Sequence, residues 1–190
     1  MATHRTSISK ALVDLINSEM DGTNTDRYFT NLYGNVSDTI LHFSDVPDFP
    51  FVGIAKGPES VEYHPAGFRW NFLTLYLRVY VRGEDDYNEQ LEAVISDLKT
   101  LIDYMETFPY TVTMPSGLAY NHQVTEITFL GLDTDEGLLA PDGFGELRLR
   151  VRYEDCNAAK GTLVESTVGS LLFNGSSLTY NGDYITYGND

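Results

Sequence analysis

The sequence predicts an α+β fold, in which two helices pack on one face of a mainly antiparallel sheet. Residues 69–82 alternate between two kinds of side chain, which is the period of a strand. Residues 91–105 place apolar side chains three and four positions apart, which is the period of an amphipathic helix. The expected order is helix, strands, helix, strands, and an apolar helix face of this kind is buried against a sheet.

The first helix is expected to start at a cap formed by Thr6 or Ser7 and to stop near Gly22. Its apolar stripe comprises Ile8, Ala11, Leu12, Leu15, Ile16 and Met20. The polar residues 24–34 follow, and they include Tyr28, Phe29, Leu32 and Tyr33. We expect these four side chains to anchor a packed loop.

Short extended segments are expected between this loop and the long strand. One strand is predicted within 36–43 and another at 51–55. Gly57-Pro58 then predicts a turn. Residues 61–67 predict a hairpin arm that leads into the long strand.

The long strand has one aliphatic face, which consists of Asn71, Leu73, Leu75, Leu77, Val79 and Val81. The opposite face consists of Trp70, Phe72, Thr74, Tyr76, Arg78, Tyr80 and Arg82. Asp86 and Glu89 have the spacing of a capping box at the start of the second helix. We expect Leu98 and Ile102 of that helix to pack on the aliphatic face of the strand.

The remainder of the main domain is expected to contain an irregular or weakly extended segment at 109–120, a strand at 124–132 and an acidic loop at 133–142. A final strand is predicted at 145–153. Its apolar residues are Leu147, Leu149, Val151 and Tyr153, and they alternate with Arg148, Arg150 and Arg152. The three arginines should therefore leave the sheet on the face opposite the helices.

The composition changes at Cys156, so we divide the chain into an α+β domain at 1–155 and a region at 156–190. The second region is rich in Gly, Asn, Ser and Tyr, and its Asn-Gly pairs between short apolar runs predict a small β appendage. A flexible tail is the alternative interpretation. Cys156 is the one cysteine, which excludes a disulfide within the chain.

The sequence offers no catalytic, metal-binding or cofactor-binding constellation. The histidines His4, His42, His64 and His122 lack the spacing of metal ligands. Neither a glycine-rich phosphate loop nor a nucleophile elbow is found, and no apolar run is long enough to span a membrane. The 28 acidic and 12 basic residues give a net charge of −16, which does not suit sequence-specific or backbone binding of DNA.

Five stretches together resemble the tail terminator proteins of long, flexible-tailed bacteriophages. They are His4–Ile8, Asn31–Ser37, Phe49–Val52, Asp135–Pro141 and Val151–Tyr153, which occur in the same order and spacing across residues 4–154. The resemblance implies a structural virion protein of α+β fold that is made in the host cytoplasm and is not an enzyme. Such proteins form a homohexameric ring on the head-proximal end of the tail tube. The ring stops tube polymerisation, receives the head-completion proteins and lets DNA pass through its lumen.

Two charged sets are the candidate interaction sites in this interpretation. The basic set is Arg78, Arg82, Arg148, Arg150 and Arg152, which we expect to face a neighbouring subunit or the tube. The acidic set is Asp133, Asp135, Glu136 and Asp142, which we expect to face the lumen or the basic set of another chain. Acidic residues near the start of the second helix, including Glu89 and Glu92, are further candidates for a lumen that repels DNA.

Two alternatives remain open from the sequence. The first is another neck or head-completion ring protein of the same particle. The second is an unrelated acidic binding module or a carboxylate-based enzyme. A stable monomer with a deep acidic cleft would favour the second alternative.

Overall fold

A computed structural model describes residues 3–63, 69–83, 86–135, 138–139 and 141–154, together with the backbone of five short strands between 164 and 184. The chain divides into two compact units. The first comprises residues 1–62 and 70–154, and the second comprises residues 63–69 and 155–190.

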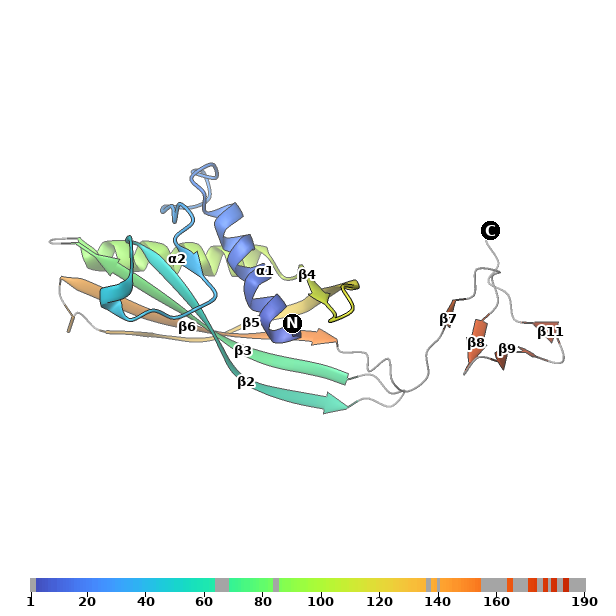
Figure 1. Ribbon diagram of the computed structural model, residues 1–190. Helices are drawn as coiled ribbons and strands as arrows, with labels where there is room; N and C mark the ends of the chain where they lie inside the picture. Colours follow the sequence, from blue (N-terminus) through green and yellow to red (C-terminus); the bar gives the residue numbers. More distant parts are fainter. Residues whose placement is uncertain are drawn as a thin grey trace. The chain divides into compact units, whose positions relative to one another are not determined.

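The first unit contains two α-helices on the same face of a six-stranded sheet (Figure 1). Its elements are α1 (His4–Glu19), β1 (Val36–Ser37), the 3-10 helix η1 (Phe43–Asp45), β2 (Phe51–Tyr63), β3 (Arg69–Arg82), α2 (Tyr87–Tyr104), β4 (Phe108–Thr113), β5 (Ala119–Thr134) and β6 (Asp142–Glu154). The strand order is β1-β2-β3-β6-β5-β4. β1 pairs with β2 in parallel, whereas β3–β6, β6–β5 and β5–β4 pair antiparallel. The predicted fold class is confirmed.

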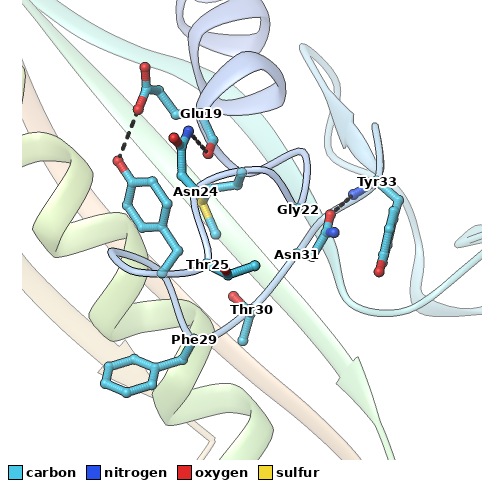
Figure 2. A pocket seen from close by; sticks show the side chains of 10 residues that line it. Glu19, Gly22, Asn24, Thr25, Phe29, Thr30, Asn31 and Tyr33 are labelled. Atoms are coloured by element: carbon cyan, nitrogen blue, oxygen red, sulfur yellow. Dashed lines mark hydrogen bonds between the residues drawn. The ribbon is translucent and has the colours of Figure 1, made fainter.

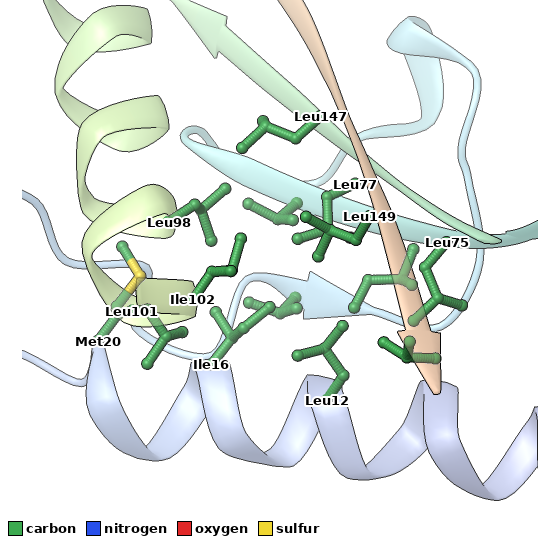
Figure 3. Close-up of a cluster of buried hydrophobic side chains, with 14 of the residues drawn as sticks. Leu12, Ile16, Met20, Leu75, Leu77, Leu98, Leu101, Ile102, Leu147 and Leu149 are labelled. Carbon is green, nitrogen blue, oxygen red and sulfur yellow. The ribbon is translucent and has the colours of Figure 1, made fainter. Parts of the chain in front are cut away.

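The main core lies between the helices and the sheet (Figure 3). The aliphatic face of β3 is buried along its whole length, as is the apolar face of β6. Leu98 is 0 % exposed and Ile102 is 7 % exposed, and both belong to the same apolar cluster as Leu75 and Leu77. The predicted packing of α2 on β3 is therefore confirmed, and the burial of Ile16 confirms the predicted stripe of α1.

The first helix starts earlier than predicted, whereas the second starts at the predicted N-cap but without the predicted capping contacts. α1 begins at His4, because Thr3 is its N-cap and accepts a hydrogen bond from the Thr6 amide. Asp86 is the N-cap of α2, but its side chain makes no capping hydrogen bond. Its backbone (φ −125°, ψ 13°) is not extended as an N-cap usually is, and its carboxylate lies beside Gly83. The predicted capping box is therefore wrong.

Several strand limits also differ. β1 spans two residues rather than the predicted 36–43, and β2 runs through Gly57-Pro58 without the predicted turn. β1 covers β2 only at Val52 and Gly53, so the outer side of β2 is a free edge beyond them, where a proline is tolerated. Of the two alternatives for 109–120, the extended one is correct, since the segment contains most of β4, a turn and the start of β5. Gly117 closes that turn with φ +86°.

The second unit contains short strands whose backbone is described. β7 (Val164–Glu165), β8 (Leu171–Phe173) and β9 (Ser176–Ser177) form a three-stranded antiparallel sheet. β10 (Thr179–Tyr180) and β11 (Asp183–Tyr184) form an antiparallel pair. This pairing agrees with the predicted β appendage. The Asn-Gly turns and the turn at 65–67 lie outside the described residues.

Candidate functional site

The face of the sheet opposite the helices carries all five predicted arginines. Arg78 and Arg82 lie on β3, and Arg148, Arg150 and Arg152 lie on β6. Each alternates with buried apolar residues that face the helices. The pairing of β3 with β6 places Thr74 opposite Arg150 and Tyr76 opposite Arg148. The five arginines therefore lie on one face of two adjacent strands, and we refer to them together as the arginine stripe.

Four arginines of this stripe are paired with carboxylates of the same chain. Two pairs join residues directly opposite each other on β3 and β6: Arg78 Nε lies 2.6 Å from Glu146 Oε2, and Arg82 Nε lies 2.6 Å from Asp142 Oδ1. Two pairs join β6 to β5: Arg148 Nη2 lies 2.9 Å from Asp133 Oδ2, and Arg152 Nη1 lies 2.8 Å from Glu126 Oε2. The acidic partners that the sequence interpretation sought on another chain are thus found on neighbouring strands.

Two of these pairs raise the pKa of their arginine. The hydrogen bond that Arg78 donates to Glu146 raises the pKa of Arg78, and the hydrogen bond that Arg82 donates to Asp142 raises the pKa of Arg82. All four pairs are partly exposed to solvent, and exposed pairs of this kind contribute little to stability. Their main effect is on charge, because the stripe presents alternating signs rather than a row of like charges.

Arg150 differs from the other four arginines. It is exposed, and in the described part of the chain it forms no ion pair. Its neighbours across the strands are Thr74 and Thr128, which carry no charge. Its guanidinium lies 5.5 Å from the centroid of the Phe72 ring, a contact that leaves the charge unneutralised. Arg150 is therefore the stripe residue that can pair with a carboxylate of another chain.

The predicted acidic loop is largely occupied by contacts within the chain. Asp133 and Asp142 belong to the ion pairs described above. Asp135 accepts hydrogen bonds from the backbone amides of Leu139 (3.1 Å) and Phe144 (3.2 Å), which stabilise the connection between β5 and β6. Glu136 lies outside the described residues. The acids of this loop that the structure describes therefore position the hairpin.

A second, smaller apolar cluster covers one end of the stripe. Its buried members are Val46, Phe51 and Tyr80, and they contact Ile40, Leu41, Phe43, Phe49 and Phe144. The Tyr80 hydroxyl donates to the Leu41 carbonyl oxygen (2.8 Å), and burial raises the pKa of this tyrosine. A Cβ at Gly53 would lie 2.9 Å from the Thr39 carbonyl oxygen, so glycine permits this segment to cross the sheet. The segment at residues 40–51 therefore covers the Arg82 end of the stripe, where Phe43 and Phe49 lie against the Arg82 guanidinium, and we call the part from Arg148 to Arg152 the open part of the stripe.

The loop at residues 20–34 surrounds a cavity of about 390 Å³ (Figure 2). The position of the loop is fixed by the carboxylate of Asp97 on α2, and this residue is 0 % exposed. This carboxylate accepts hydrogen bonds from the Phe29 amide (3.0 Å), the Thr30 amide (2.6 Å) and the Thr30 hydroxyl (2.6 Å). A buried carboxylate with such partners stabilises one loop conformation.

Two aromatic side chains on the rim of this cavity point into solvent. Phe29 is 84 % exposed and Tyr33 is 79 % exposed, so the prediction that they anchor a packed loop is wrong. Tyr28 and Leu32 are buried and are the anchors. Tyr33 has φ +47°, which is uncommon for a residue with a side chain, and its amide donates to Asn31 Oδ1 (2.8 Å). The loop therefore holds two large apolar groups outward.

The histidines are not all dispersed, although their sequence positions suggested it. The His4 and His122 rings lie with centroids 4.7 Å apart, and His4 Nδ1 lies 2.9 Å from the Tyr110 hydroxyl oxygen. His4 also stacks on Tyr153 at 5.4 Å. These contacts tie the start of α1 to β4, β5 and β6. Among the described residues, no group of three or more metal-ligating side chains is close enough to hold an ion.

Sequence reasoning found the arginine stripe but missed Asp97 and the exposed pair Phe29 and Tyr33. Asp97 falls on the apolar side of α2, where its charge is the one exception in a buried stripe. That exception was the available signal, since a charged residue at a core position requires partners. No helix that the structure describes is long and apolar enough to cross a membrane.

Comparisons with known proteins give consistent similarities. A family model described as Bacteriophage Tail Tube Terminator Protein matches residues 2–160. The tail tube terminator protein p142 of Escherichia phage T5 is 44 % identical over 151 residues, which cover 80 % of this chain and 94 % of the relative. Among solved structures, a chain from the virion of a native gene transfer agent particle is 14 % identical with a TM-score of 0.48. The alignment covers 78 % of this chain and 96 % of the gene transfer agent chain.

Proposed function

Because this chain belongs to the bacteriophage tail tube terminator family, we propose that it caps the head-proximal end of the tail tube. In this position it stops tube polymerisation and provides the surface to which head-completion proteins attach. The family match over residues 2–160 carries the proposal. Membership confirms the resemblance seen in the sequence, and it makes the chain a structural protein of the virion rather than an enzyme.

We further propose that the cap is a homohexameric ring through whose lumen the DNA passes. A ring requires two different patches on each subunit, and such patches can be sought on this chain. The net charge of −16 suits a passage that repels phosphate. Glu89 and Glu92 are exposed on α2 and form no ion pair among the described residues, so they suit the lumen better than the occupied acidic loop.

The open part of the arginine stripe is the proposed contact with the tube or with a neighbouring subunit. Arg150 supports this assignment because it is exposed and lacks a carboxylate in the described part of its own chain. A carboxylate on the partner would complete an alternating pattern of charges across the two chains. Arg148 and Arg152 are already neutralised and contribute mainly shape.

The proposed function is tested by adding the purified chain to purified tail tubes and imaging them by electron microscopy. We expect additional density at one end only, the end that binds heads, and no further growth when tube protein is supplied. Density along the tube wall, or unchanged growth, would contradict capping. Binding to filled heads in the absence of tails would instead indicate a neck or head-completion role.

A further inference from the structure

The part of the β4–β5 hairpin in which the two strands pair, residues 108–124, carries no Asp, Glu, Lys or Arg, although the chain has 28 acidic and 12 basic residues in 190. Three large apolar side chains near its tip are exposed: Met114 by 46 %, Leu118 by 59 % and Tyr120 by 51 %. Protein interfaces show this composition, because charged residues are depleted at their centres and aromatic residues and methionine are enriched.

The same hairpin also lies at an edge of the sheet. β4 is the last strand of the six-stranded sheet, so within the described residues one side of its backbone has no partner strand. Natural edge strands are protected against association by charged side chains, by proline or by being short. The exposed positions of β4 are Pro109, which is one such protection, and the uncharged Thr111 and Thr113. An uncharged edge with an apolar tip is consistent with a surface that is covered in an assembly.

The rim of the cavity at residues 20–34 is a second apolar patch on the same unit. Phe29 and Tyr33 project from a loop that Asp97 holds in place, so docking would need little ordering of the loop. Exposed aromatic groups beside a cavity have the character of interface hot spots. The cavity of about 390 Å³ falls in the size range of binding pockets and can admit side chains.

The two patches lie at opposite ends of α1. The start of this helix contacts β4 through His4 and Tyr110, whereas its end leads directly into the loop at residues 20–34. The 16 residues of the helix separate the two ends by about 24 Å, at 1.5 Å per residue. Two different patches on one subunit are what a head-to-tail contact between identical chains needs.

We propose that the tip of the β4–β5 hairpin of one copy docks on the Phe29–Tyr33 rim of the next copy. This inference rests on the ring proposed above and assigns its subunit contact. The proposed ring makes a second copy the occupant, because each subunit of a head-to-tail ring needs two different patches. Each copy has a net charge of −16, and the uncharged hairpin adds no repulsion of its own at the contact.

The test uses two variants of the full chain, Leu118→Asp on the hairpin and Phe29→Asp on the rim. Both side chains are more than half exposed in the subunit, so each variant should retain the wild-type unfolding temperature. Native mass spectrometry should show the ring for the wild type and only the 21.3 kDa monomer for each variant. Leu138→Asp is the matched control. Leu138 is 86 % exposed and lies between β5 and β6, outside both patches, so this variant should still form the ring.

Mixing the two variants tests the pairing itself. The intact rim of Leu118→Asp can receive the intact hairpin of Phe29→Asp, so the mixture should form a one-to-one dimer and nothing larger. Absence of that dimer, or a ring that persists in either variant, would overturn the proposal. Raising NaCl from about 50 to 500 mM screens the repulsion between acidic chains, so association should not weaken. Dissociation in salt would instead indicate a contact between charged groups.

The outcome for capping is scored separately on tail tubes. A wild-type chain that remains monomeric at about 100 µM would overturn the hairpin contact, whereas its binding to tube ends would leave the capping function intact. Conversely, a chain that forms rings through the hairpin but does not bind tubes would support the subunit contact and overturn the capping function. The two proposals can therefore fail independently.

Discussion

Replacement of Asp97 by asparagine is expected to destabilise the chain and release the loop at residues 20–34. The carboxylate is fully buried and accepts three hydrogen bonds, two from the amides of Phe29 and Thr30 and one from the Thr30 hydroxyl. An asparagine side chain offers only one oxygen, and its NH₂ group would face a donor. At least one amide would therefore lose its partner.

The size of the effect follows from these bonds. A hydrogen bond to a charged group contributes about 1.5–3 kcal/mol, and a buried group left without a partner costs about 1–3 kcal/mol. We expect the free energy of unfolding to fall by about 2–4 kcal/mol. With a urea dependence of about 2 kcal/mol per M, the midpoint of unfolding should fall by about 1–2 M.

The assay combines urea unfolding with hydrogen exchange at individual amides. The Phe29 and Thr30 amides should exchange faster in Asp97→Asn, because Asp97 is the acceptor that protects them. Asp103→Asn is the matched control, since Asp103 is exposed on the same helix and should change stability by less than about 0.5 kcal/mol. A loss below about 0.5 kcal/mol for Asp97→Asn, with unchanged exchange at both amides, would refute the reasoning.

Three further predictions concern the core, the stripe and the second unit. Leu98→Ala should lower the free energy of unfolding by about 2–5 kcal/mol in chemical denaturation, because Leu98 is fully buried, whereas the exposed Glu92→Ala should change it little. Arg150→Glu should fold normally but bind tube ends less tightly in a pelleting assay, while Lys10→Glu on α1 should bind like the wild type; equal binding by both would remove Arg150 from the contact. Deletion of residues 159–190 should leave cooperative thermal unfolding intact, and loss of that transition would place the region in the core.

Local periodicity determined much of the fold. The period of two at 69–82 and at 145–153 identified β3 and β6 and the faces that they bury, because successive side chains of a strand point to opposite sides. The three- and four-residue spacing around Leu98 identified the buried stripe of α2 in the same way. The short motifs between residues 4 and 154 were sufficient to indicate the family.

Strand limits were predicted less accurately from the sequence, because they depend on which neighbouring strand pairs with a segment. Residues 109–120 became strand because β5 supplies hydrogen-bond partners to β4. Gly57-Pro58 stayed within β2 because the outer side of that strand is a free edge there. Neither condition can be read from the residues of the segment alone.

Only the tertiary structure decided which charges and aromatic side chains remain available. Arg78 finds Glu146 across 68 positions of sequence and Asp97 finds Thr30 across 67, so no local pattern could reveal either pair. By itself the sequence showed a row of arginines, an acidic loop and a polar loop with aromatic residues. Strand pairing places a carboxylate next to four of the arginines. The Asp97 carboxylate binds the Phe29 amide, and the Phe29 side chain, which we expected to be an anchor, is exposed. The physical reason is that periodicity determines which face of an element a residue occupies, whereas its partner is determined by how distant elements pack.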